Sequence, residues 1–336
     1  SSRRRHTRLL TQSRGLGDVY KRQVFQSALF SAPGRPRPLA RRLAIHNRVV
    51  GRVRRFLTDE GFNEVPLTAL APVCDACEAT AAGFAVDHHG NLAFTRQSGQ
   101  LVLDGMLARG FPATWCESES LRREWKVDER HLSSFKLVEA ERRGLDLDGL
   151  CDLQERLLRA VIADLGADLL GGRHVTRLDR ALRLEHPRLT YREALAQLNR
   201  CGWSLPFGED LHRDAEACLS RYVGDVPFFL THLPAELKPF NLRRDPADPD
   251  QCLSVECILP WAGETMDGGV REPDPAVMQQ QLEASEHYRR LLAQAGTFAA
   301  TLAAAPTRQG GKSADLAKRN RAAVRRAFAR YLDGFG

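Results

Sequence analysis

The order of the strand-like and helix-like segments constrains this 336-residue chain more than any other feature. Short runs typical of strands, at 92–96, 113–119 and 134–141, alternate irregularly with amphipathic helical patterns at 41–60 and 151–170. A parallel sheet built from βαβ units would need a regular alternation of strand and helix. The irregular order therefore predicts an α+β fold whose sheet is largely antiparallel and flanked by helices.

Local signals define where two further helices begin. The segment Thr190-Tyr-Arg-Glu193 has the capping-box pattern, in which each end of the motif satisfies a backbone N–H of the other. It predicts a helix that runs to about residue 200. Asp274 followed by Pro275 is typical of a helix start, because proline is tolerated at the first helical position. This pair predicts one helix over 276–294.

Charge is distributed unevenly along the chain. Residues 1–55 carry a net charge of +14, residues 308–336 carry +6, and the middle carries −13, although the whole chain is at +7. An acidic middle does not favour a broad nucleic-acid face on the folded core, because phosphate contacts need clustered cations. The basic ends are expected to be solvated, with polyanion binding as the alternative.

Composition divides the chain into three parts. Residues 1–40 lack a clean periodicity and include a Pro/Arg-rich stretch, so we expect a disordered or artefactual leader and linker there. Residues 41–305 are expected to form the folded domain, with a small helical insertion at 186–223. Residues 306–336 are expected to be a basic tail that contains an amphipathic helix.

The cysteines and the absence of long apolar runs point to the cytoplasm. With no secretory signal apparent, the eight cysteines are expected to be reduced thiols. Cys74-x-x-Cys77, with His88 and His89 nearby, is a weak zinc pattern because no second such pair follows. No apolar run approaches the roughly 20 residues that a membrane helix needs, so no membrane partner is expected.

Arginines and acids between two predicted strands form the strongest chemical pattern. Arg122 and Arg130 suit bidentate contacts to phosphate, and Phe135 can stack on a base. Glu139 and Glu141 fall on one face of the second strand by its two-residue period. A triphosphate site is one interpretation, and a salt-bridged hairpin is the other.

A third stretch adds acids and glycines. Glu256 and Glu264 bracket a Pro/Gly turn, and their hard carboxylate oxygens suit the Mg²⁺ that accompanies a nucleotide. Gly268 and the glycine after it permit close backbone approach, and Arg271 follows at once. Each of these features is common on its own, so only their combination indicates a function.

Read together and in this order, the segments resemble the catalytic core of class II aminoacyl-tRNA synthetases, in particular the asparaginyl/aspartyl (asparagine-synthetase-like) branch. The resemblance covers about 41–295. Residues 47–72 resemble motif 1, which builds that family's dimer interface, and 115–141 resemble motif 2. Residues 234–240 resemble its P-x-E-x-K-P-F strand, and 268–272 resemble its GGSxRE segment.

The resemblance assigns roles to the ATP-site residues. It implies that Arg122 is the catalytic residue that holds the α-phosphate. Phe135 would stack on adenine, and Glu124 would lie on the adenine or amino-acid side. Arg130 and His131 would contact the γ-phosphate. The ATP-binding set implied in full is Arg122, Glu124, Arg130, His131, Leu132, Phe135, Glu264 and Arg271, with Mg²⁺ held by Glu256 and Glu264.

The same resemblance gives an amino-acid pocket. Its implied residues are Ser98, Gln100, Asp104, Glu139 and Gly268, and the segment 97–101 resembles the mobile substrate loop. Aspartate enzymes place a lysine where Leu103 stands here, and a desolvated aspartate without a cation would be costly. Leu103-Asp104 is instead similar to the Leu-Glu of the asparagine enzymes. Asparagine is therefore favoured over aspartate.

Some features depart from the family pattern. No anticodon-reading β-barrel is found, Ser134 and Val270 replace the usual Glu and Ser, and motif 3 is expected to be missing or degenerate. The resemblance implies a cytoplasmic, homodimeric ligase that uses ATP and Mg²⁺ to form an aminoacyl-adenylate, with tRNA or a free amine as acceptor. The alternative is an inactive paralogue that regulates or binds tRNA.

Overall fold

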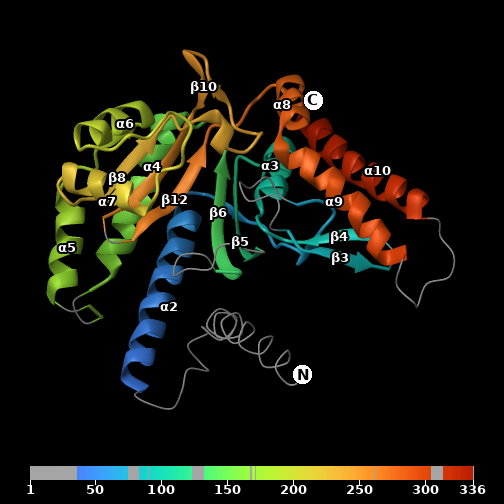
Figure 1. Ribbon diagram of the computed structural model, residues 1–336. Helices are drawn as coiled ribbons and strands as arrows, with labels where there is room; N and C mark the ends of the chain where they lie inside the picture. Colours follow the sequence, from blue (N-terminus) through green and yellow to red (C-terminus); the bar gives the residue numbers. More distant parts are fainter. Residues whose placement is uncertain are drawn as a thin grey trace, which may run out of the picture.

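The computed structural model describes residues 36–74, 83–89, 91–122, 132–166, 169–170, 172–260, 262–303 and 313–335 (Figure 1). Two main sheets form its centre. In the first, β1 (Asn63–Glu64) pairs in parallel with β5 (Ala113–Leu121), and β5 pairs antiparallel with β6 (Ser134–Arg142). In the second, the strand order is β12 (Gly263–Gly269), β11 (Ser254–Leu259), β8 (Phe228–Thr231) and β7 (Arg188–Thr190).

Two smaller sheets contain the other strands of the described residues. In one of them β4 (Asn91–Thr95) lies between β2 (Leu70–Ala71) and β3 (Ala85–His88), antiparallel to both. The other is the ribbon of β9 (Arg244–Asp245) and β10 (Asp248–Cys252). Among the described pairs only β1–β5 and β7–β8 are parallel. The prediction of an α+β fold with a largely antiparallel sheet is confirmed.

The helices flank these sheets (Figure 1). They are α2 (Pro36–Asp59), α3 (Gln100–Ala108), α4 (Leu147–Asp164), α5 (Gly172–Arg183), α6 (Tyr191–Arg200), α7 (Arg213–Tyr222), α8 (Pro275–Ala284), α9 (Glu286–Ala303) and α10 (Ser313–Leu332), with short 3-10 turns at Ala235–Leu237 and Asp333–Phe335. None of the helices in these described ranges is long and apolar enough to span a membrane.

Helix α2 begins inside the segment expected to be a linker. The structure starts the helix at Pro36 rather than at residue 41. Pro36 and Pro38 stand in the first turn, where the backbone N–H groups have no partner within the helix and proline removes nothing. The two prolines are therefore compatible with the helix, which in the described residues begins five positions before the expected helix at 41–60.

The predicted helix over 276–294 is two helices. The backbone of Ser285 is extended, with φ −71° and ψ 144°, and so separates α8 from α9. Its hydroxyl accepts a hydrogen bond from the Tyr288 N–H at 3.2 Å and donates one to the Leu282 carbonyl at 2.6 Å. A serine that caps one helix while closing another explains the break.

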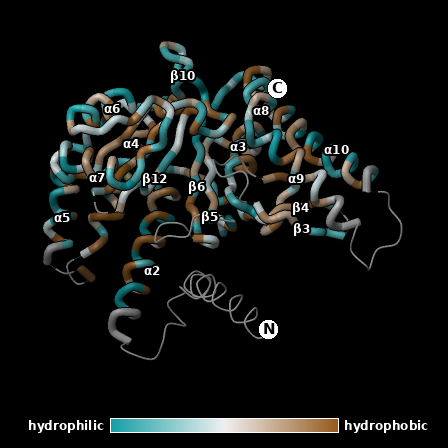
Figure 2. Tube along the Cα trace, viewed as in Figure 1, coloured by the Kyte–Doolittle hydropathy of each residue, from teal (hydrophilic) through white to brown (hydrophobic). Residues whose placement is uncertain are grey.

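The C-terminal helix is part of the core rather than of a tail. Val324 and Phe328 of α10 are 1% and 2% exposed and belong to one buried cluster with Phe94, Met278 and Leu291. Hydrophobic residues recur along α9 and α10, which lie side by side (Figure 2). The helix expected at 312–333 is present as Ser313–Leu332, and its apolar face packs into this cluster rather than lying in solvent.

The helical insertion forms its own cluster on the second sheet. The capping box at Thr190 is present, and α6 and α7 enclose a core with Phe228, Leu230 and Ile258. On the other side, Cys151 and Leu158 of α4 pack with Val255. The sheet is thereby covered on both faces, which fixes the position of β12 and of the residues that follow it.

Candidate active site

Glu139 on β6 anchors the loop that was predicted to close over a substrate. Its carboxylate accepts hydrogen bonds from the Ser98 hydroxyl at 2.5 Å, the Gly99 N–H at 2.7 Å and the Ser118 hydroxyl at 2.8 Å. Ser98 is 1% exposed. The structure therefore brings together Ser98 and Glu139, two of the residues predicted for the amino-acid pocket, and uses them to hold each other.

Gly99 is required by this contact. A Cβ atom at residue 99 would lie 2.4 Å from the Cys116 sulfur and 3.3 Å from Glu139 Oε2. Only glycine lets the backbone N–H approach the carboxylate so closely. Gln100 follows as the first residue of α3, so the loop also fixes the start of the helix that carries Asp104.

Asp104 of α3 lies in a buried ionic cluster with residues from β6 and from the segment that follows β12. It is 1% exposed, and its Oδ1 accepts a hydrogen bond from Arg271 Nε at 3.1 Å. Arg271 also donates from Nη2 to Glu141 Oε1 at 2.7 Å. The side chain of Arg271 is 24% exposed, so the cluster reaches solvent on the arginine side.

The charges in this cluster shift one another's proton affinities. Burial and the nearby Asp104 raise the pKa of Glu141 well above its usual range, although Arg271 opposes the shift. Burial alone would lower the pKa of Arg271, but the Asp104 and Glu141 carboxylates raise it. Two acids around one cation therefore favour a protonated Glu141, because a second buried negative charge lacks compensation.

Two members of the cluster were not predicted from the sequence. The Asn241 amide donates to Asp104 Oδ2 at 3.2 Å, and the Tyr331 hydroxyl donates to the same oxygen at 2.8 Å. Asn241 directly follows the 234–240 segment, and its position next to that motif could have marked it as a site residue. Tyr331 comes from α10, and nothing in its neighbouring sequence marked it.

Arg122 and Phe135 lie together at the ends of β5 and β6. The guanidinium carbon is 5.1 Å from the centroid of the Phe135 ring, and Nε donates to the Ser120 hydroxyl at 3.2 Å. Leu132, three residues before Phe135, is half-buried. The predicted residues Glu124, Arg130 and His131 lie outside the described residues. The guanidinium of Arg122 is thus adjacent to the Phe135 ring.

The two predicted Mg²⁺ ligands lie in different environments. Glu256 is buried, and its Oε1 accepts a hydrogen bond from Lys238 Nζ at 2.6 Å. A carboxylate already neutralised by lysine is poorly suited to a divalent cation. Glu264 is exposed on β12. No group of three or more His, Cys, Asp or Glu side chains that could hold a metal occurs in the described ranges.

The remaining predicted positions are structural in their contacts. Gly268 is half-buried on β12, and a Cβ there would approach Leu150 to 3.3 Å. Leu103 is fully buried in a cluster with Val65 and Cys116. Cys74 is buried, whereas Cys77 lies outside the described residues. Leu103 therefore packs into the core beside the ionic cluster.

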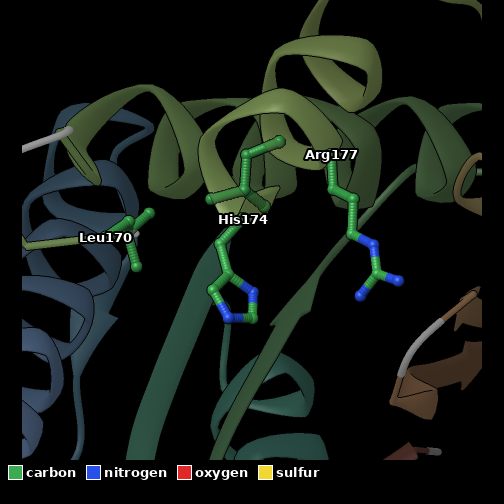
Figure 3. Close-up of a pocket in the computed structure, with 4 residues that line it drawn as sticks. Leu170, His174 and Arg177 are labelled. Carbon is green, nitrogen blue, oxygen red and sulfur yellow. The ribbon is translucent and has the colours of Figure 1, made fainter. Parts of the chain in front are cut away.

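A hollow beside α5 is separate from this site. Leu170, His174, Arg177 and Leu178 line it, and none of the predicted site residues does. Figure 3 shows the side chains of His174 and Arg177 on the same side of the helix. Both residues are exposed, so the hollow offers no enclosed arrangement of reactive groups.

Comparison with known proteins agrees with this geometry. Residues 34–312 match the family model described as "tRNA synthetases class II (D, K and N)". The chain belongs to the class II tRNA synthetases. This membership confirms the resemblance found in the segments from 41 to 295, and the mixed helices and antiparallel sheets are those of the synthetase core.

Within the synthetase family, asparagine–tRNA ligases are among the similar proteins. The chain is 32% identical to the asparagine–tRNA ligase of Sorangium cellulosum over 266 residues, which cover 73% of this chain and 58% of the relative. It is 32% identical to that of Thermus thermophilus over 246 residues, covering 69% and 55%.

A solved structure gives the same picture. Asparaginyl-tRNA synthetase from Pyrococcus horikoshii, complexed with asparaginyl-adenylate, is similar at 25% identity with a TM-score of 0.66, covering 76% of this chain and 60% of that one. The chain thus spans a little over half the length of the curated relatives it matches.

Proposed function

We propose that this chain forms an aminoacyl-adenylate from asparagine and ATP. The observation that carries the proposal is the Asp104–Arg271 pair, which stands on α3 and directly after β12. An acid beside an arginine offers an acceptor for the amide N–H of asparagine and a donor for its carbonyl oxygen. The relatives named as asparagine–tRNA ligases support the same substrate.

The reaction is an attack of the amino-acid α-carboxylate on the α-phosphorus of ATP, which releases pyrophosphate. Arg122 would stabilise the negative charge that develops on the phosphate, and Phe135 would stack on adenine. No side chain needs to remove a proton, because the attacking carboxylate is already ionised. Catalysis would rest on fixed charge and orientation.

The other assignments follow the family. Mg²⁺ would accompany ATP and offset phosphate charge, with Glu264 as the exposed acid nearest to that role. The acceptor would be tRNA or a free amine, and the protein would be a homodimer built on α2 and β1. A cytoplasmic location is supported by relatives whose names include that word.

Pyrophosphate exchange with single amino acids tests the proposal. The purified chain is incubated with ATP, Mg²⁺ and labelled pyrophosphate, with either asparagine or aspartate present. Exchange into ATP with asparagine, and much less with aspartate, is expected. Exchange with aspartate alone would contradict the pocket assignment but leave the family intact. Calorimetric binding of ATP and of asparagine serves as a measurement that needs no turnover.

A further inference from the structure

The contact between Tyr331 and Asp104 joins the C-terminal helix to the amino-acid pocket. The two residues lie 227 positions apart, and the hydroxyl oxygen is 2.8 Å from Asp104 Oδ2. The proposed function uses Asp104 and Arg271 but gives no role to α10. Helix α10 therefore contacts a residue of the proposed amino-acid pocket in addition to stabilising the core.

The hydrogen bonds to Asp104 are divided between its two oxygens. Oδ2 accepts from both Tyr331 and Asn241, whereas Oδ1 accepts from Arg271. A carboxylate has about four acceptor positions, two on each oxygen. Oδ2 is thus filled by two neutral donors, and Oδ1 faces Arg271, whose side chain is 24% exposed.

We propose that Tyr331 is a positioning residue for amino-acid selection, which holds Asp104 Oδ2 so that Oδ1 is presented to the amide N–H of asparagine. This inference rests on the proposed function. It adds a specificity element from α10, a helix that carries none of the site residues predicted from the sequence. Tyr331 itself touches Asp104 and acts through it.

Two observations support a fixed donor at this position. The ring of Tyr331 packs edge-to-face against Phe240, with centroids 6.3 Å apart, and against Phe335 at 5.2 Å. Burial and the Asp104 carboxylate raise the pKa of Tyr331 well above its usual range. The hydroxyl therefore keeps its proton, and the ring cannot rotate freely away from the carboxylate.

Tyr331→Phe tests the inference, because phenylalanine keeps the ring and removes only the donor. Binding of asparagine alone and of ATP alone is measured by calorimetry on the full chain. We expect the Kd for asparagine to rise about tenfold, as for one hydrogen bond to a charged group, and the Kd for ATP to stay within about twofold. Tyr288→Phe is the matched control, since Tyr288 packs against Phe328 in the same cluster.

The outcomes separate this inference from the proposed function. Asparagine affinity that is unchanged in Tyr331→Phe, in a protein whose wild type binds asparagine, overturns the inference alone. Equal weakening of asparagine and ATP shows a general structural role and also overturns it. A wild-type chain that binds ATP but not asparagine overturns the proposed function, and the positioning role falls with it.

Discussion

At the scale of single residues, Glu139 collects more of the site's hydrogen bonds than a surface acid would. Its donors include a backbone N–H that only Gly99 can bring close. Glu139→Gln places an amide N–H where a donor already points. We expect a loss of about 1–3 kcal/mol in the free energy of unfolding, measured by urea denaturation. Glu283→Gln on exposed α8 is the control and should change it by less than about 0.5 kcal/mol.

Arg122 gives a second prediction at this scale, one that concerns binding. The side chain stacks near Phe135 and lies at the end of β5, where the proposed function places the α-phosphate. Arg122→Ala should weaken ATP binding or adenylate formation by about two orders of magnitude, as for a charge-assisted contact in a dry site. Arg143→Ala, at an exposed position just after β6, is the control. Equal ATP affinity in the two variants would remove Arg122 from the site.

At the scale of elements, α10 decides whether the C-terminal segment belongs to the fold. Phe328 is 2% exposed and contacts the rings of Phe240, His287 and Tyr288. Phe328→Ala should lower the free energy of unfolding by about 3–5 kcal/mol, because it removes buried contacts and leaves a cavity. Arg325→Ala on the exposed face should cost less than about 0.5 kcal/mol. If the C-terminal segment were a detached tail, neither substitution would change the free energy of unfolding.

At the scale of the whole molecule, buried ionisable groups couple stability to pH. Burial lowers the pKa of His287 to about 4, from an ordinary value of 6.5. Below pH 6.5 the unfolded chain binds a proton that the folded protein does not take up until about pH 4. This group therefore lowers the free energy of unfolding as pH falls through that window, by about 3 kcal/mol in all.

Glu141 acts in the opposite direction, because its raised pKa favours the folded state as pH falls. The contribution of His287 is therefore measured as a difference between two proteins. Urea denaturation of wild type and His287→Phe at pH 6.5 and 4.5 should show that wild type loses about 2–3 kcal/mol more than the variant. Parallel losses in both proteins would show that His287 titrates normally.

The sequence by itself determined the kinds of element and the family. The capping box at Thr190 and the proline after Asp274 depend on residues only a few positions apart, and the two helix starts that they mark are present in the structure. The order of strand, arginine-rich loop and acid-bearing strand is also a local feature, and it led to the class II synthetases. The break at Ser285 was harder to predict from the sequence, because the helical periodicity continues across it and only one capping serine marks the boundary.

Only the tertiary structure decided which side chains meet. The pairs Arg271–Asp104, Lys238–Glu256 and Tyr331–Asp104 join residues far apart in the chain, and no sequence pattern indicated which residue would meet which. The periodicity of α10 predicted a helix, but it could not say which surface would receive Val324 and Phe328. Hydrogen bonds and burial depend on how sheets and helices pack in three dimensions, because a carboxylate is neutralised by whichever donor the fold places within about 3 Å of it.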